Sequence, residues 1–306
     1  MSGSGSGSGT PGGEAGAAAE EDPVSYFLQD LTYHGKTDRT RRAYERVLRR
    51  YEAFLADPGR NPSGEALAPS EASYRHCMAW VHGIRGTVES STVATYAAYL
   101  HRFYAYMTQV GAFDSNPMAL VMEELDERVE TDPERRDLSV ADVRRFVAGV
   151  THPLHRAVLV TFLKTGVRVG ELCNLDLRDL RLVDSVAAAE YDLDGRGQLD
   201  GRPDALFVAA APARGETYNG EERTASNKRR RDTVVPVDGE LRSCLERWLA
   251  ARPDAVSPAE PLFPGTADSW GRRLTPKSVR TFVTDYARAE GWHREGGDAA
   301  ENVTPH

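Results

Sequence analysis

One stretch of the sequence, residues 161–180, combines residue types and spacing that suggest chemistry. It reads TFLKTGVRVGELCNLDLRDL, and apolar residues recur before it at helical intervals. Gly166 falls where a helix end favours a left-handed residue, so we expect a helix, a sharp turn and a second helix. Arg168 would begin the second helix, with Glu171 one turn further on. A guanidinium held there by the backbone suits a negatively charged group, and the alternative is a solvated arginine paired with Glu171.

The composition fits two globular domains and a tail. The chain has 306 residues, of which 40% are apolar, and a formal net charge of −8. An acidic balance by itself argues against a nucleic-acid partner, because phosphate binding draws on lysine and arginine. The charge is uneven, however: residues 39–50 hold six arginines against one glutamate, and residues 228–231 are four consecutive cations. Local basic faces on an acidic body remain compatible with DNA.

Three cysteines, Cys77, Cys173 and Cys244, lie far apart and show no paired spacing. This pattern predicts a reduced compartment and no structural zinc, and we find no metal-ligand spacing elsewhere. The sequence has no apolar run long enough to cross a bilayer and no basic-then-apolar leader. We therefore expect a cytoplasmic protein with no membrane partner.

Composition and periodicity divide the chain into four parts. Residues 1–22 read as a disordered Gly/Ser/Ala tail, residues 23–125 as a helical domain, residues 126–137 as an acidic linker, and residues 138–306 as a second domain. In the helical domain, the helix after Asp38 carries an apolar stripe. Four arginines lie away from that stripe: Arg42, Arg46, Arg49 and Arg50.

The second domain is expected to contain a small sheet among helices. Residues 205–210 and 233–237 have strand character, and a basic hairpin would join them. Ser139 and Thr275 are placed to cap helices, and residues 239–251 form another amphipathic helix. The predicted fold class is therefore mainly α with a small β-sheet.

The motif TGVRVGEL-x-x-L-x-x-x-D-L resembles the segment around the first catalytic arginine of tyrosine recombinases, the phage-integrase family, which usually reads T-G-[LMV]-R-x-[SG]-E-[LIV]-x-x-L. Three further segments resemble the family in the same order: SSTVATYAAYLHRFYAYMTQVGAFDSNP, PLFPG and VTPH. The resemblance implies a helical core-binding domain that clamps double-stranded DNA, followed by a mixed α/β integrase-type catalytic domain. Members work as tetramers on DNA.

The resemblance also implies roles for individual residues. Arg168 would stabilise charge on the scissile phosphate, with Glu171 orienting it. Lys228, eight residues before Pro236 as in the family, would protonate the leaving 5′-oxygen, unless it belongs to a solvated basic loop. His306 resembles the first histidine of H-x-L-R-H. We also predict DNA contacts by five arginines, whose alternative is a solvated face: Arg42, Arg46, Arg49, Arg229 and Arg230.

In this family a tyrosine attacks the phosphate to give a 3′-phosphotyrosyl link, without a metal or a small-molecule cofactor. The second arginine and the tyrosine are expected beyond residue 306, and none of the 12 tyrosines present occupies the expected place. We therefore expect a chain that binds DNA without cutting it and is monomeric when isolated. Three hypotheses remain: a recombinase lacking its C-terminal catalytic segment, a non-catalytic integrase-like protein that occupies recombination sites, and an acidic scaffold without a DNA role.

Overall fold

The computed structural model describes residues 22–127, 136–191, 193, 195–297 and 301–305. The chain separates into two compact units, Met1–Asp132 and Pro133–His306. Apart from Asp22, the predicted tail lies outside the described residues, as do residues 128–135 of the predicted linker. The predicted domain limits therefore stay a prediction.

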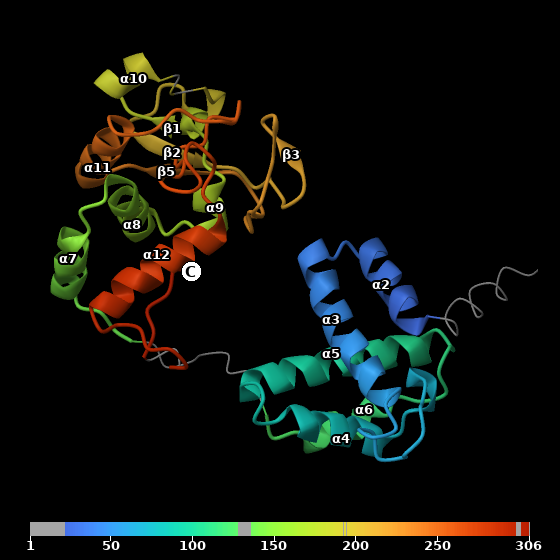
Figure 1. Cartoon of the computed structure of the whole chain (residues 1–306). Helices are drawn as coiled ribbons and strands as arrows, with labels where there is room; N and C mark the ends of the chain where they lie inside the picture. Colours follow the sequence, from blue (N-terminus) through green and yellow to red (C-terminus); the bar gives the residue numbers. More distant parts are fainter. Residues whose placement is uncertain (1–21, 128–135, 192, 194, 298–300, 306) are drawn as a thin grey trace, which may run out of the picture. The chain divides into compact units, whose positions relative to one another are not determined.

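The first unit is helical, with its helices packed around one apolar core (Figure 1). Its helices are α2 (Pro23–Tyr33), α3 (Asp38–Leu55), α4 (Tyr74–Ile84), α5 (Ser90–Gln109) and α6 (Met118–Glu124), with a 3₁₀ turn, η1 (Pro69–Glu71), before α4. The predicted stripe of α3 is buried through Val47, Leu48 and Tyr51. The cap of α3 is Thr37, whose Oγ1 accepts from the Thr40 amide at 3.3 Å, so Asp38 is the first helical residue.

The second unit combines helices with short strands. Its helices are α7 (Val140–Gly149), α8 (Pro153–Thr165), α9 (Val169–Cys173), α10 (Val186–Glu190), α11 (Gly239–Leu249) and α12 (Pro276–Ala289), with 3₁₀ turns η2 (Leu177–Asp179) and η3 (Gly197–Leu199). Its strands are β1 (Leu180–Arg181), β2 (Ala205–Val208), β3 (Thr217–Tyr218), β4 (Glu221–Glu222) and β5 (Thr233–Pro236). The predicted fold class, mainly α with a small sheet, is confirmed.

The main sheet is antiparallel, in the order β1-β2-β5, with Leu206 opposite both Leu180 and Val235. Side chains alternate across β2: Leu206 and Val208 enter the main core, whereas Phe207 enters a second, smaller cluster with Leu199. The central strand is therefore buried on both faces.

The two predicted strands pair antiparallel, and the connection between them contains a further hairpin. Residues 209–232 connect β2 to β5 and include a separate two-stranded hairpin, β3–β4, which turns at Asn219 and Gly220, both with positive φ. Asn and Gly tolerate such backbone angles, which explains the turn. Lys228 consequently lies on the returning part of a long connection, outside any strand.

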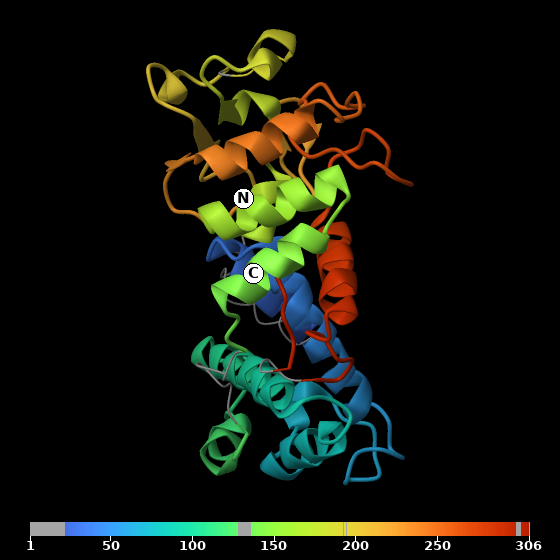
Figure 2. The same ribbon diagram turned by 90° about the vertical axis from the view of Figure 1, so that its left-hand side faces the viewer.

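Helices α8 and α11 pack along each other in the main core (Figures 1 and 2). The indole of Trp248 on α11 is buried and donates a hydrogen bond to the Leu262 carbonyl at 2.8 Å. Leu262 belongs to the PLFPG segment, and its amide donates to the Leu175 carbonyl at 2.9 Å. The segment that follows α9 is thereby tied to the core.

Candidate active site

The α8–α9 turn presents Arg168 as the sequence predicted. Helix α8 ends at Gly166, whose φ of 62° is left-handed and whose amide donates to the Phe162 carbonyl at 3.0 Å. Two residues later Arg168 forms the N-cap of α9. The backbone of Arg168 is therefore fixed by both helices.

Glu171 binds Arg168 twice. The Arg168 backbone amide donates to Oε2 at 2.9 Å, and its Nη1 donates to Oε1 at 3.2 Å. The Glu171 side chain is 0% exposed, whereas that of Arg168 is 58% exposed. A buried carboxylate therefore positions a guanidinium whose other donors face solvent, and the predicted pairing with Glu171 is present.

The far end of α9 is held by Arg273. Its Nη1 donates to the carbonyls of Cys173 and Leu175, at 3.0 and 3.1 Å. The Cys173 carbonyl lies in the last turn of α9, where carbonyls lack an intrahelical partner, so the guanidinium satisfies it. The Leu175 carbonyl, just after the helix, accepts from the Leu262 amide as well. Helix α9 is thus held from both ends.

A buried ionic network surrounds Asp176, just after α9. Asp176 accepts two hydrogen bonds from Arg223, at 3.0 and 2.8 Å, and one from Arg273, at 2.6 Å. The side chains of Asp176 and Arg223 are 0% exposed. Glu221 accepts from the Nε of Arg273 at 2.9 Å, which brings strand β4 into the network. The network fixes the β3–β4 hairpin against the segment that follows α9.

The segment at 225–229, which carries Lys228, packs directly on α9. A Cβ on Gly170 would lie 2.7 Å from the Ser226 carbonyl oxygen, closer than a side chain permits. Asn174 donates from Nδ2 to the Ala225 carbonyl at 3.0 Å and to Oδ1 of Asn227 at 2.8 Å. Tertiary contacts therefore place the backbone around Lys228 beside the helix that begins at Arg168.

Lys228 itself is exposed, and among the described residues it has no hydrogen bond or ion pair. Its neighbour Arg229 approaches Glu171, with Nε 3.3 Å from Oε2, while Arg230 is exposed. His306, the third predicted catalytic residue, lies outside the described residues. Convergence of Arg168 and Lys228 on one phosphate stays a prediction.

The three arginines singled out on α3 differ in their surroundings. Arg42 and Arg46 are exposed. Arg49 instead donates to Asp22 at 2.7 Å and to Glu52 at 2.8 Å, and its guanidinium holds the pKa of Asp22 well below the usual range of a carboxyl group. Its role in DNA binding stays a prediction, but its donors are engaged within the unit.

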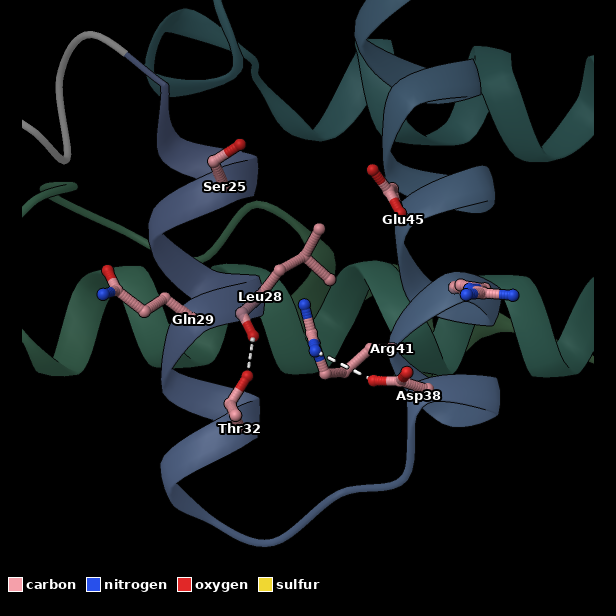
Figure 3. A pocket seen from close by; sticks show the side chains of 8 residues that line it. Ser25, Leu28, Gln29, Thr32, Asp38, Arg41 and Glu45 are labelled. Carbon is pink, nitrogen blue, oxygen red and sulfur yellow. Dashed lines mark hydrogen bonds and ion pairs between the residues drawn. The ribbon is translucent and has the colours of Figure 1, made fainter. Parts of the chain in front are cut away.

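The first unit also has a shallow hollow of about 360 Å³ between α2 and α3 (Figure 3). Its lining includes Arg41 and Arg42, but also Asp38 and Glu45, and Asp38 accepts a hydrogen bond from Arg41 at 3.0 Å. Because the charges offset one another, the hollow does not form an anion site.

The described residues contain no group of three or more His, Cys, Asp or Glu side chains placed to hold a metal ion. Nor does any helix in the described part of the chain have the length and apolar character needed to span a membrane.

Comparison with known proteins identifies the family to which this chain belongs. Residues 140–306 match the family model described as the phage integrase family. The chain belongs to the phage integrase family. It is 22% identical over 297 residues to tyrosine recombinase XerC of Vibrio parahaemolyticus, covering 94% of this chain and 76% of the relative. It is 31% identical over 142 residues to tyrosine recombinase XerC 1 of Ralstonia nicotianae, covering 44% and 35%.

Solved integrases share the fold of this phage-integrase member. The Tn1549 transposon integrase in complex with a circular intermediate DNA has a TM-score of 0.63 and 16% identity, over 92% of this chain and 83% of that one. A lambda integrase tetramer bound to a Holliday junction has a TM-score of 0.62 and 14% identity, over 92% and 68%. A lambda integrase dimer bound to a core site has a TM-score of 0.57 and 13% identity, over 89% and 63%.

Sequence reasoning missed the residues that support the site of this integrase-family chain. They are Asn174, Asp176, Arg223, Asn227 and Arg273. Their hydrogen-bond partners lie about 50 to 100 positions away in the sequence, so no local sequence pattern predicts these contacts. The sequence contained one local signal, Gly170 in the first turn of α9. Glycine is unfavourable within a helix, so its presence there indicates that another part of the backbone approaches closely.

Proposed function

We propose that this chain acts in site-specific DNA recombination of the tyrosine-recombinase type, and that Arg168 and Lys228 bind the phosphate at which strands are exchanged. Family membership supports the reaction class. The observation that carries the assignment of residues is the packing of the 225–229 segment on α9, through Gly170 and Asn174.

The chemistry follows from the two cations. A phosphoryl group gathers negative charge in the transition state of strand transfer, and a fixed guanidinium stabilises that charge without reorganising. Arg168 meets this need. Glu171 accepts from its backbone amide and from its Nη1, and the other N–H groups of the guanidinium stay available. The exposed ammonium of Lys228 would donate a proton to the leaving 5′-oxygen. We assign the nucleophile to no residue of this chain.

The first unit would add contacts to the DNA backbone. Arg42 and Arg46 are one helical turn apart on α3 and exposed. Such arginines bind phosphates without reading sequence and make affinity depend steeply on salt. We propose that the chain binds duplex DNA and assembles on it, in keeping with the relatives solved as a dimer and a tetramer on DNA.

The test is equilibrium binding of the full chain to a labelled mixed-sequence duplex, measured by fluorescence anisotropy over a series of salt concentrations. We expect salt-sensitive binding whose affinity falls on Arg168→Ala and on Lys228→Ala. The charge-matched control is Arg288→Ala, because Arg288 forms an exposed ion pair with Asp285 on α12.

Absence of salt-sensitive binding by the unchanged chain would reject the DNA role. Binding that responds equally to Arg168→Ala, Lys228→Ala and Arg288→Ala would reject the assigned site while keeping DNA as the partner. A thermal unfolding midpoint measured for each variant separates lost contacts from lost folding.

A further inference from the structure

Two arginines share one buried carboxylate at the candidate site. Glu171 accepts hydrogen bonds from the backbone and side chain of Arg168, and the Nε of Arg229 lies 3.3 Å from its Oε2. The three groups come from two segments far apart in the sequence, α9 and the connection between β4 and β5. The carboxylate thus links two guanidinium groups that the chain sequence separates.

The charges of this cluster do not balance. One carboxylate faces two guanidinium groups, so the cluster keeps one positive charge after Glu171 is neutralised. Arg229 is also mostly withdrawn from water, with a side chain 20% exposed. Water stabilises such a charge less than it does on the surface, and an additional anion would lower its free energy.

The hydrogen bonds are incomplete as well. The Nε of Arg229 is buried and has no hydrogen-bond partner, even though Glu171 is near. Each Glu171 oxygen accepts one hydrogen bond from Arg168, Oε2 from the backbone amide and Oε1 from Nη1. A buried donor without an acceptor is uncommon and costly, so an additional acceptor beside Arg229 would be stabilising.

The alternation of side chains along the 225–229 segment explains why Arg229 is more buried than the cations beside it. Exposure alternates along the segment: Asn227 and Arg229 are half-buried toward α9, whereas Lys228 and Arg230 are exposed. Asn227 is bonded on that inner side to Asn174. Of the cations at 228–231, Arg229 is thus the one held against the Arg168 cluster.

We propose that Arg168 and Arg229 together form a two-guanidinium clamp for a single phosphate of the DNA backbone, with Glu171 setting their separation. This rests on the proposed function, which it deepens by adding a residue to the phosphate site. Guanidinium groups bind phosphate oxygens through paired donors, so two of them can occupy different oxygens of one phosphate.

The salt dependence of DNA binding tests the clamp, because its slope counts the phosphates that are neutralised. The full chain is titrated into a labelled mixed-sequence duplex as Arg168→Gln, as Arg229→Gln and as the double variant. We expect each single change to weaken binding about tenfold. The slope should change little in each single variant and fall by about 1 in the double variant, because either guanidinium alone still neutralises the shared phosphate.

Three results would overturn the clamp. The first is Arg229→Gln binding like the charge-matched control Arg288→Gln. The second is a slope that falls by about 2 in the double variant, which would place the arginines on separate phosphates. The third is a lower unfolding midpoint for Arg229→Gln with unchanged affinity below that midpoint, which would make Arg229 only a structural partner of Glu171.

Arg229→Lys adds a check on geometry. It keeps the charge beside Glu171 but loses the forked donors, so we expect it to restore part of the affinity lost in Arg229→Gln. The results distinguish failure of the proposed function from failure of the clamp. If the unchanged chain does not bind DNA, both proposals are rejected. If Arg168→Gln weakens binding while Arg229→Gln does not, only the clamp is rejected.

Discussion

Gly170 and Ser226 lie in direct contact, with the position of a Cβ on Gly170 only 2.7 Å from the Ser226 carbonyl oxygen. The contact joins α9 to the segment that carries Lys228, although the two are more than 50 residues apart in the sequence. Since the obstructing atom belongs to the backbone, it cannot rotate away as a side chain would.

We therefore predict that Gly170→Ala displaces the 225–229 segment. The added methyl group should cost about 1–3 kcal/mol in the free energy of unfolding and also weaken DNA binding. The control is Gly149→Ala in α7, where a Cβ meets nothing within 4 Å, and which should be neutral or stabilising. Urea unfolding and anisotropy check the pair, and equal behaviour of the two variants would contradict the prediction.

The buried pair of Arg223 and Asp176 predicts a large stability effect. Both side chains are 0% exposed, so Arg223→Ala leaves a buried carboxylate with one cation fewer. We expect a loss of about 3–5 kcal/mol in the free energy of unfolding. Arg288→Ala, which breaks an exposed pair screened by solvent, should change it little. If Arg223→Ala changed the free energy of unfolding in urea only slightly, Arg273 alone would be enough to neutralise the charge of Asp176.

On α3, Arg46 and Arg49 should separate binding from stability. Arg46→Ala removes an exposed cation and should reduce the salt slope of DNA binding by about 1 with unchanged unfolding. Arg49→Ala breaks partly exposed ion pairs with Asp22 and Glu52 and should cost about 1 kcal/mol of stability with little change in slope. The reverse pattern would make Arg49 a DNA contact.

His155 should make stability depend on pH. Burial, and secondly the neighbouring charge of His152, lowers the pKa of His155 to about 4. Its ring stacks between His152 and Phe282, with centroid distances of 4.1 Å to each. The folded pKa lies below the ordinary value of about 6.5, so this contribution is full above pH 6.5 and is lost as pH falls toward 4.

The loss should reach at most ~1.4 kcal/mol per pH unit. Urea unfolding measured between pH 7 and pH 4 provides the check, with His155→Phe as the comparison, because carboxyl groups also titrate there. The variant should lose less stability than the unchanged chain over this interval. Parallel curves would show that His155 does not contribute.

Local residue order was enough to predict the turn that presents Arg168. The helix before Gly166, the left-handed glycine, the cap position of Arg168 and its pairing with Glu171 involve residues no more than a few positions apart. Such features are set by local sterics and short-range hydrogen bonds, which sequence encodes directly. Two of the three strands of the main sheet, β2 and β5, were likewise predicted from their β-branched and apolar residues.

The long connection between these strands shows where local reasoning stopped. The predicted strands pair, but within their connection the chain also forms β3–β4 and buries Arg223 against Asp176, which the sequence did not indicate. An arginine in a polar segment looks solvated in sequence, and only the distant carboxylate explains its burial.

The sequence alone therefore determined the family motif, the fold class and the backbone geometry of Arg168. The tertiary structure decided which cations stand beside it, because the position of Arg229 depends on the packing of its segment over Gly170 and on a carboxylate contributed by another part of the chain. Contacts of this kind arise when the chain closes long loops around a core, and their geometry is fixed by packing and burial that no short stretch of residues specifies.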